Sequence, residues 1–206
     1  MQIVGPELGG AAALEAAFPR HLGDDVRKAL AVLPPAPHAR TSPFRVLVDG
    51  EPVLIPSRIY LDEPSVAAEA ALSATHRAVL DCLYTRHHDG RVRQRRLERV
   101  VGLFQPWVAP FVVQLVGEYV DEILLVIWRA LAPELVVPHS PADAVYGRFA
   151  AENPAFVALT DKRITSYWDC YHRGRYPTLV DYPGHAMTAA LRASAERHDA
   201  SDGDAR

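Results

Sequence analysis

The chain has 206 residues, of which 49% are hydrophobic and 23% are charged, and its formal net charge is −3. This length suits one domain, or one domain with appendages, and is enough to bury roughly 70% of the surface that the unfolded chain exposes. The weak negative charge excludes a protein whose overall electric field draws it to nucleic acid or to a membrane.

The first 43 residues are predicted to form an appendage followed by a linker. Apolar residues recur at helical spacing up to Leu33, which indicates a short helix over residues 24–33. The next segment, PPAPHARTSP, is rich in proline and is expected to be extended. We therefore divide the chain into an appendage with its linker at 1–43, a helical domain at 44–192 and a disordered polar tail at 193–206.

Residues 44–60 are predicted to form a β-hairpin. The segments FRVLV and EPVLI flank Asp49-Gly50, a residue pair that a two-residue type I′ turn favours. Pro52 and Pro56 restrict the second strand to the edge of a sheet, because proline donates no ladder hydrogen bond. A lone hairpin is only marginally stable, so this one is expected to pack on helices.

Two helices are predicted next, the first over about 66–87 with a break near Ser73, and the second over about 92–104. Asp89-Gly90 separates them. The second helix and the residues before it carry a run of arginines. The run consists of Arg86, Arg91, Arg93, Arg95, Arg96 and Arg99.

The segment Pro110–Leu131, PFVVQLVGEYVDEILLVIWRAL, predicts one long helix that is apolar on most of its circumference. At about 33 Å such a helix could cross a bilayer. However, Glu118, Asp121 and Glu122 lie in its middle, where each charge costs about 2.5–3.5 kcal/mol on insertion. A buried central helix of a water-soluble domain is therefore favoured.

Further helices are predicted over 142–152, from Asn153-Pro154 to Arg173, and over 185–192. The expected fold class is mainly α: a compact helical domain around the buried central helix at about 110–131, with one small β-hairpin at about 44–60.

The arginine run could contact phosphates, and the two helices around Asp89-Gly90 loosely resemble the start of a helix-turn-helix module. A third helix would then have to read base edges, but PFVVQLVGEYV is apolar and acidic and cannot do so. A solvated face, or ion pairs with Glu118, Asp121 and Glu122, is favoured. Nucleic-acid binding through residues 91–99 and docking of an acidic partner remain alternatives.

The acidic residues Glu118, Asp121 and Glu122 form a stripe on the predicted central helix. Carboxylates on adjacent turns of a buried helix can bind two metals in four-helix bundles, but that chemistry needs Glu-x-x-His pairs on facing helices. No such pair was found. We therefore expect a structural polar network with arginine, and neither a metal nor a cofactor.

No catalytic signature is present. Nucleophile elbows, phosphate loops, dinucleotide fingerprints and HExxH motifs are absent. Cys170 and His172 are two residues apart, a spacing that points side chains in different directions on a helix. His76 lies in an apolar stripe and is expected to be a hydrogen-bonded core histidine. Catalytic residues are therefore not assigned.

Residues 167–185 concentrate tyrosine, tryptophan, histidine and arginine, which suits packing on the central helix, a protein interface or a small-molecule site. The favoured function is a non-catalytic cytoplasmic module that binds another protein or has a regulatory role. The alternatives are a nucleic-acid-binding protein and an enzyme with a site near 167–185. The residues expected to bind the partner are Arg91, Arg95, Arg99, Trp168, Tyr171, His172, Arg175 and Tyr176.

Two observations favour the cytoplasm. Cys82 and Cys170 each stand alone without metal-ligand spacing, which fits a reducing compartment. The sequence begins MQIVGPELGG, which lacks the basic and then apolar segments of a signal peptide.

Overall fold

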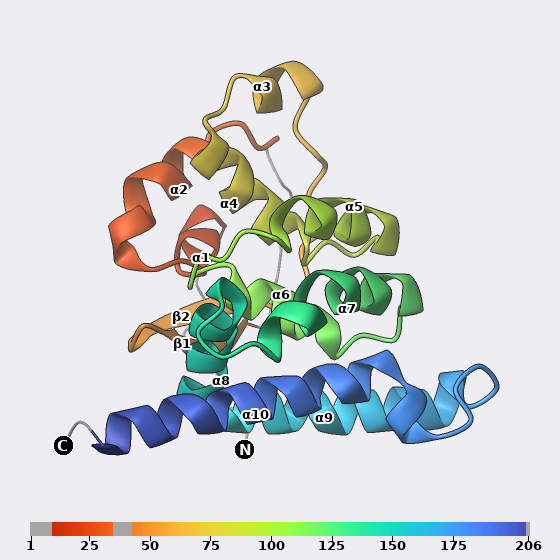
Figure 1. Cartoon of the computed structure of the whole chain (residues 1–206). Helices are drawn as coiled ribbons and strands as arrows, with labels where there is room; N and C mark the ends of the chain where they lie inside the picture. Colours follow the sequence, from red (N-terminus) through yellow and green to blue (C-terminus); the bar gives the residue numbers. More distant parts are fainter. Residues whose placement is uncertain (1–9, 35–42, 205–206) are drawn as a thin grey trace. The chain divides into compact units, whose positions relative to one another are not determined.

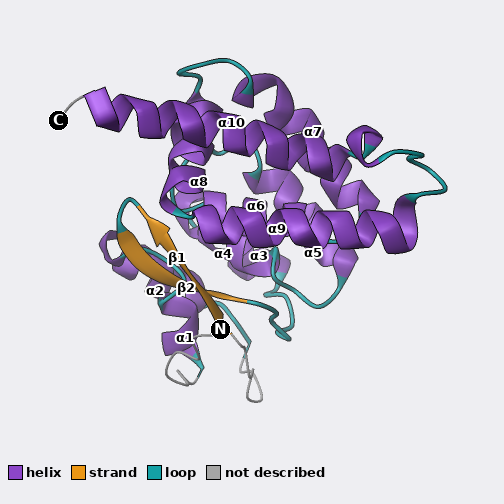
Figure 2. Ribbon diagram, turned by 90° about the horizontal axis from the view of Figure 1, so that it is seen from below, coloured by secondary structure: helices purple, strands orange, loops and turns teal. Residues whose placement is uncertain are grey.

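A computed structural model describes residues 10–34 and 43–204 of the chain, and its side chains up to residue 198. Within these ranges the chain forms ten α-helices, several short 3-10 and π-helical turns, and one two-stranded hairpin (Figures 1 and 2). The prediction of a mainly α fold with a small hairpin is confirmed. The proline-rich segment lies largely outside the described residues.

The contacts within the chain divide it into two compact units. The first unit comprises residues 1–46 and 51–100, and the second comprises residues 47–50 and 101–206. This division differs from the predicted one, because the helices before residue 34 belong with residues 51–100 and the chain divides near residue 100. The predicted domain limits remain to be tested in solution.

The first unit begins with α1 (Ala11–Glu15) and α2 (Gly23–Leu30). Leu14 of α1, Val26 of α2 and Phe18 of the segment that connects them are buried. His76 Nε2 lies 2.9 Å from Asp25 Oδ1, so the second of these helices is also joined to the unit by a polar contact. His76 therefore has a carboxylate partner at the margin of the core. The N-terminal region, predicted to be an appendage, is packed here into its unit.

The hairpin consists of β1 (Pro43–Val48) and β2 (Glu51–Pro56). Asp49 and Gly50 both have positive φ, 50° and 76°, which is the backbone conformation that the predicted type I′ turn requires at its two central residues. Asparagine, aspartate and glycine tolerate this left-handed region best. The local turn chemistry thus determines the position of the hairpin.

Three more helices complete the first unit: α3 (Val66–Ala70), α4 (Ala74–Tyr84) and α5 (Gly90–Val100). The predicted helix over 66–87 is interrupted at Ser73, as the sequence indicated. The Ser65 and Ser73 hydroxyls cap α3 and α4 by accepting hydrogen bonds from backbone N–H groups, each at 3.2 Å.

The second unit contains α6 (Ala109–Val116), α7 (Asp121–Leu135), α8 (Arg148–Glu152), α9 (Pro154–Tyr167) and α10 (Pro183–Asp204). Short turns η2 (Asp143–Gly147), η3 (Trp168–His172) and η4 (Leu179–Asp181) connect them. The long helices α9 and α10 lie side by side (Figure 2). Every residue of α6 is buried, which makes this short helix the centre of the unit.

The prediction of one continuous helix over 110–131 is wrong, because the chain breaks it into α6 and α7. Gly117 ends α6 with φ −84° and ψ 26°, and Val120 is extended before α7 begins. A Cβ at Gly117 would lie 3.3 Å from Thr160 of α9, closer than most such contacts. Close packing against α9 thus favours glycine here, and glycine supports a helix poorly.

The predicted disordered tail from residue 193 also differs from the structure, because α10 continues to Asp204. The helix is held by a buried carboxylate: Asp143 Oδ1 accepts hydrogen bonds from Ser194 Oγ and Arg197 Nη2, both at 2.5 Å. Polar composition suggested disorder, but these side chains point at one buried acid. The tertiary contact therefore overrides the local composition.

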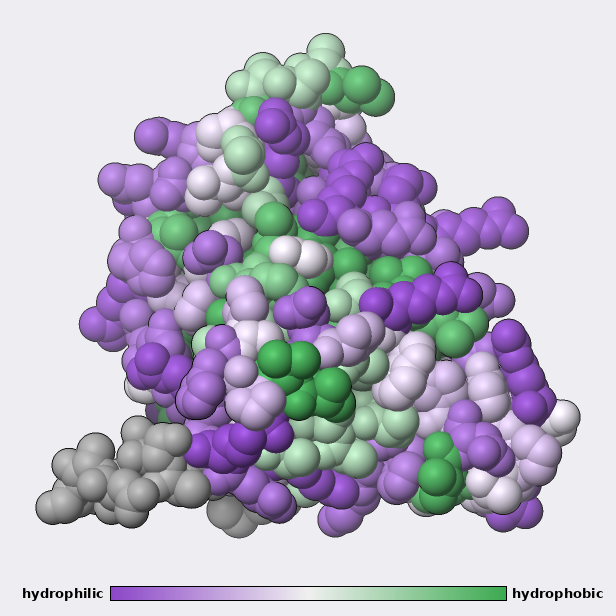
Figure 3. Space-filling model, in the orientation of Figure 1, coloured by the Kyte–Doolittle hydropathy of each residue, from purple (hydrophilic) through white to green (hydrophobic). Residues whose placement is uncertain are grey.

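Hydrophilic residues cover most of the face in Figure 3, where hydrophobic groups appear as separate green areas. Helix α3, at the top of that view, is weakly hydrophobic, and its Val66 is 86% exposed. Among the described residues, none of the helices has both the length and the hydropathy required to cross a bilayer.

Candidate functional site

The arginine run divides into buried and exposed members. Arg86, Arg93 and Arg96 are buried, whereas Arg91 is exposed to solvent with Arg95 and Arg99. Arg86 donates from Nε to the Pro56 carbonyl oxygen, and Arg93 donates from Nη1 to the carbonyl oxygens of His87 and His88. Half of the run therefore stabilises the first unit from within.

Arg96 is the centre of an ionic cluster that we call the Arg96 cluster. Its guanidinium lies 2.6 Å from Glu63 Oε1, 2.7 Å from Glu69 Oε1 and 2.8 Å from Asp81 Oδ1. The same group lies over the Tyr84 ring, 5.0 Å from its centroid. A buried arginine needs such partners, because leaving a charge uncompensated in the interior is costly.

The acids of the Arg96 cluster titrate differently. Burial raises the pKa of Asp81, and the hydrogen bond from Arg96 does not fully offset this effect. Burial also acts to raise the pKa of Glu63 and of Glu69, but hydrogen bonds from Arg96, together with Arg95 or Arg99, bring both values below the ordinary range. The Arg96 guanidinium stays charged, because its hydrogen bonds to the acids raise its pKa despite burial.

The exposed arginines Arg95 and Arg99 belong to the same cluster. Arg95 Nη2 lies 2.5 Å from Glu63 Oε2, and Arg99 Nη1 lies 2.6 Å from Glu69 Oε1. The acids that pair with the run are thus Glu63, Glu69 and Asp81, where the sequence had suggested Glu118, Asp121 and Glu122. Much of the positive charge is neutralised within the first unit, which weakens any field directed at phosphates.

The predicted acidic stripe is divided by the break between α6 and α7. Asp121 is buried and forms an ion pair with Arg175, and it accepts hydrogen bonds from the Tyr176 hydroxyl at 3.0 and 3.1 Å. Glu118 is also buried, whereas Glu122 is exposed. Asp121 and Glu122 occupy the first turn of α7, where negative charge favours the helix.

A cluster of three tyrosines lies at one end of the second unit, and we call it the tyrosine surface. The ring centroids of Tyr119 and Tyr167 are 5.9 Å apart, and the centroid of Tyr171 lies 6.2 Å from each of them. Tyr171 is 69% exposed and Tyr119 is 53% exposed. Large rings are thus gathered in contact with one another and with solvent.

The backbone beneath the tyrosine surface is a π-helical turn, η3, at the end of α9. Its residue His172 places Nε2 3.0 Å from the Tyr119 carbonyl oxygen, which joins the turn to the loop between α6 and α7. Single π-helical turns often mark functional sites, because the altered spacing redirects side chains. Here the turn carries Tyr171 outward.

Two arginines flank the tyrosine surface and stack on aromatic rings. The Arg173 guanidinium lies 4.9 Å from the Trp168 ring centroid, and that of Arg175 lies 5.5 Å from the Tyr176 ring centroid. Trp168 in turn donates from its indole nitrogen to the Tyr176 carbonyl oxygen at 2.9 Å. These side chains are therefore held in place by contacts within the second unit.

The structure brings together the predicted residues Trp168, Tyr171, His172, Arg175 and Tyr176, and the predicted arginines 91, 95 and 99 lie in the other unit. Two members of the surface were missed as site residues. Tyr119 was assigned to the middle of the central helix, and Tyr167 fell within the segment 167–185 but was not among the residues expected to bind the partner. The signal that could have found Tyr119 is Gly117, a glycine inside an apolar helical pattern.

Each of the two units contains one free cysteine. Cys170 is exposed and unpaired, and Cys82 of the first unit is buried with a pKa well above the usual range because of its burial. In the part of the chain that the structure describes, no three side chains of the metal-binding types come together. No protein-family model, curated protein or solved structure matches this chain.

Proposed function

We propose that this chain is a protein-binding module and that its partner binds at the tyrosine surface. The observation that carries the proposal is the set of three tyrosine rings in mutual contact, of which Tyr119 and Tyr171 remain more than half exposed. Tyrosine is enriched among the residues that dominate binding energy at protein interfaces, since its ring buries a large area at low entropic cost.

The partner that fits this surface is a protein segment with apolar side chains next to carboxylates. The apolar part would cover the tyrosine rings. The acidic part would meet Arg173 and Arg175, whose side chains are 62% and 61% exposed although each has one acidic neighbour in its own unit. Arginine held against an aromatic ring loses little freedom on binding, which favours an ion pair with an incoming carboxylate.

A cytoplasmic location and a regulatory role belong to the same proposal. They are supported by the exposed thiol of Cys170, which suits a reducing compartment, and by the presence of a binding surface without an assigned catalytic group.

Selection of peptides from a random display library on the full chain tests the proposal. Selected peptides are expected to combine leucine, phenylalanine or proline with aspartate or glutamate. Their affinity should fall by about tenfold or more for the Tyr119→Ala/Tyr171→Ala variant, because hot-spot residues carry most of the binding energy. Tyr60→Ala is the matched control, since Tyr60 is 59% exposed and lies in the first unit.

Two results would reject the proposal. One is a selection that yields no peptide above background on the wild-type chain. The other is a set of peptides whose affinity is the same for the double variant and for the wild type.

A further inference from the structure

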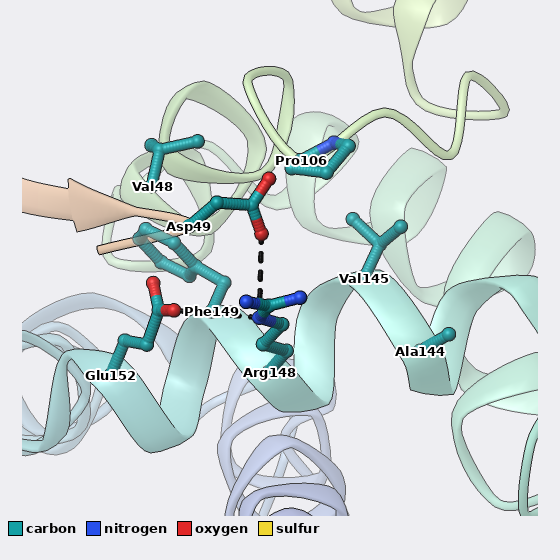
Figure 4. A pocket seen from close by; sticks show the side chains of 8 residues that line it. All are labelled: Val48, Asp49, Pro106, Ala144, Val145, Arg148, Phe149 and Glu152. Carbon is teal, nitrogen blue, oxygen red and sulfur yellow. Dashed lines mark hydrogen bonds and ion pairs between the residues drawn. The ribbon is translucent and has the colours of Figure 1, made fainter. Parts of the chain in front are cut away.

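A small open pocket of about 320 Å³ lies within the second unit, and none of the residues that line it belongs to the tyrosine surface (Figure 4). Its apolar lining comes from Val48 of the hairpin tip, Pro106, and Val145 and Phe149 of the segment that runs from η2 into α8. Three charged side chains complete it. They are Asp49, Arg148 and Glu152.

Arg148 lies between the two acids of the pocket. Its Nε is 3.3 Å from Asp49 Oδ1 and 3.4 Å from Glu152 Oε1, so one N–H is shared by two long contacts. No hydrogen bond from Nη1 or Nη2 to another described residue is formed, and the side chain is 58% exposed. The guanidinium can therefore still receive a carboxylate through its two terminal amino groups.

Glu152 presents an acceptor with no partner among the described residues. Its Oε2 is shielded from solvent and accepts no hydrogen bond, while Oε1 faces Arg148. Because this shielded oxygen cannot be contacted from the pocket, Glu152 would act on a bound molecule through its negative charge. Asp49, 44% exposed at the turn, supplies a second negative group at the same rim.

We propose that this pocket binds a free α-amino acid with an apolar side chain. The ammonium group would contact the exposed Asp49 carboxylate, near the negative charge of Glu152, and the carboxylate would meet the terminal amino groups of Arg148. The side chain would cover Val48, Val145 and Phe149. A zwitterion matches the site because acceptor and donor groups of opposite charge lie at one rim above an apolar floor, as in other small-molecule sites.

Titration calorimetry with leucine on the full chain tests this inference. Leucine should bind, whereas 4-methylpentanoic acid, which lacks the ammonium group, and isoamylamine, which lacks the carboxylate, should each bind at least about tenfold more weakly, since each loses a charge-assisted contact. Glycine should also bind more weakly, because it lacks the apolar side chain. Binding of isoamylamine as tight as that of leucine would reject the role of Arg148.

Substitutions of the charged residues of the pocket provide a second test of this inference. Arg148→Gln and Glu152→Gln should each weaken leucine binding at least about tenfold while the circular dichroism spectrum is retained. Arg27→Gln is the matched control, because the Arg27 side chain is 57% exposed, pairs with Asp24 three residues away and lies in the first unit. The inference is overturned if leucine gives no heat at millimolar concentration, or if all three variants bind it like the wild type.

Discussion

The Arg96 cluster and the tyrosine surface use residue types that protein interfaces favour, yet they serve opposite purposes. Arg96 is 2% exposed and contacts three acids of its own unit. Tyr171 is 69% exposed, and its ring lies next to those of Tyr119 and Tyr167. Composition alone does not distinguish these cases. Burial and the number of internal partners decide whether a side chain stabilises the fold or remains available for binding.

The largest expected effect is that of breaking the Arg96 cluster. Arg96→Met should lower the free energy of unfolding by about 3–5 kcal/mol, because it leaves the acids of a buried ionic cluster uncompensated. Urea denaturation is the measurement. Arg91→Ala, at an exposed position of the same helix, should stay within about 0.5 kcal/mol of the wild type. Equal losses in the two variants would contradict the distinction between buried and exposed arginines.

A second substitution, Gly147→Ala, tests whether the second unit depends on the close packing of α10 at this position. A Cβ at Gly147 would come closer than 3.0 Å to both Ser194 and His198, where α10 meets Asp143. Gly147→Ala should therefore cost about 1–3 kcal/mol through overpacking. Gly102→Ala, where a Cβ meets nothing within 4 Å, is the control. A neutral effect of Gly147→Ala would show that α10 is not held at this point.

Acid should destabilise both units. The pKa of Asp143 is lowered, because hydrogen bonds from Ser194, the His139 backbone and Arg197 outweigh the effect of burial. The pKa values of Glu63 and Glu69 are lowered as well. A carboxyl group with a lowered pKa stabilises the fold when the pH is above its pKa in the unfolded chain, which is about 4. This stabilisation is lost as the pH falls through its pKa in the folded protein.

Asp81 has the opposite effect on the pH dependence of stability, because its pKa is raised. The ionised Asp81 carboxylate therefore lowers the free energy of unfolding at neutral pH, and its protonation raises the free energy of unfolding as the pH falls. The acid loss in the first unit therefore comes from Glu63 and Glu69. Denaturation curves between pH 3 and 7 should show a shallower acid loss for Arg96→Met than for the wild type. If stability falls equally steeply with pH in the variant and in the wild type, Arg96 is not what lowers the pKa values of Glu63 and Glu69.

The smallest effect on stability is expected at the tyrosine surface. Tyr171→Ala should change the free energy of unfolding by no more than about 0.5 kcal/mol, because most of its side chain is already in water. Thermal denaturation measures this, with Tyr60→Ala for comparison. A loss as large as that of Arg96→Met would assign the ring to packing rather than to binding.

Turn chemistry was the most reliable guide in the sequence. Asp49-Gly50 located the hairpin and Ser73 located the helix break, since both depend on residues adjacent in the chain. The same local rules failed at the end of the central helix, which was expected at Leu131, because α7 continues through Pro133 to Leu135. Proline in this last turn removes a hydrogen bond from the helix, and the buried side chains of Leu131 and Leu135 on either side of it hold the turn in place.

Tertiary partners could not be predicted. Asp81 and Glu63 are 15 and 33 residues from Arg96, and no periodicity relates them. The tyrosine surface was predicted in part, because its composition is local between residues 168 and 176. Tyr119 joins it from another loop, at a distance of 53 residues from His172. Only the fold brings such residues together.

The affinity of a selected peptide for two variants tests the central claim most directly. One variant is Tyr119→Ala/Tyr171→Ala, and the other is Arg91→Ala/Arg95→Ala/Arg99→Ala, which removes the exposed arginines of the first unit. If the tyrosine surface binds the partner, the tyrosine variant should lose about tenfold or more in affinity and the arginine variant should bind like the wild type. Loss of binding in the arginine variant, with full affinity in the tyrosine variant, would contradict the account.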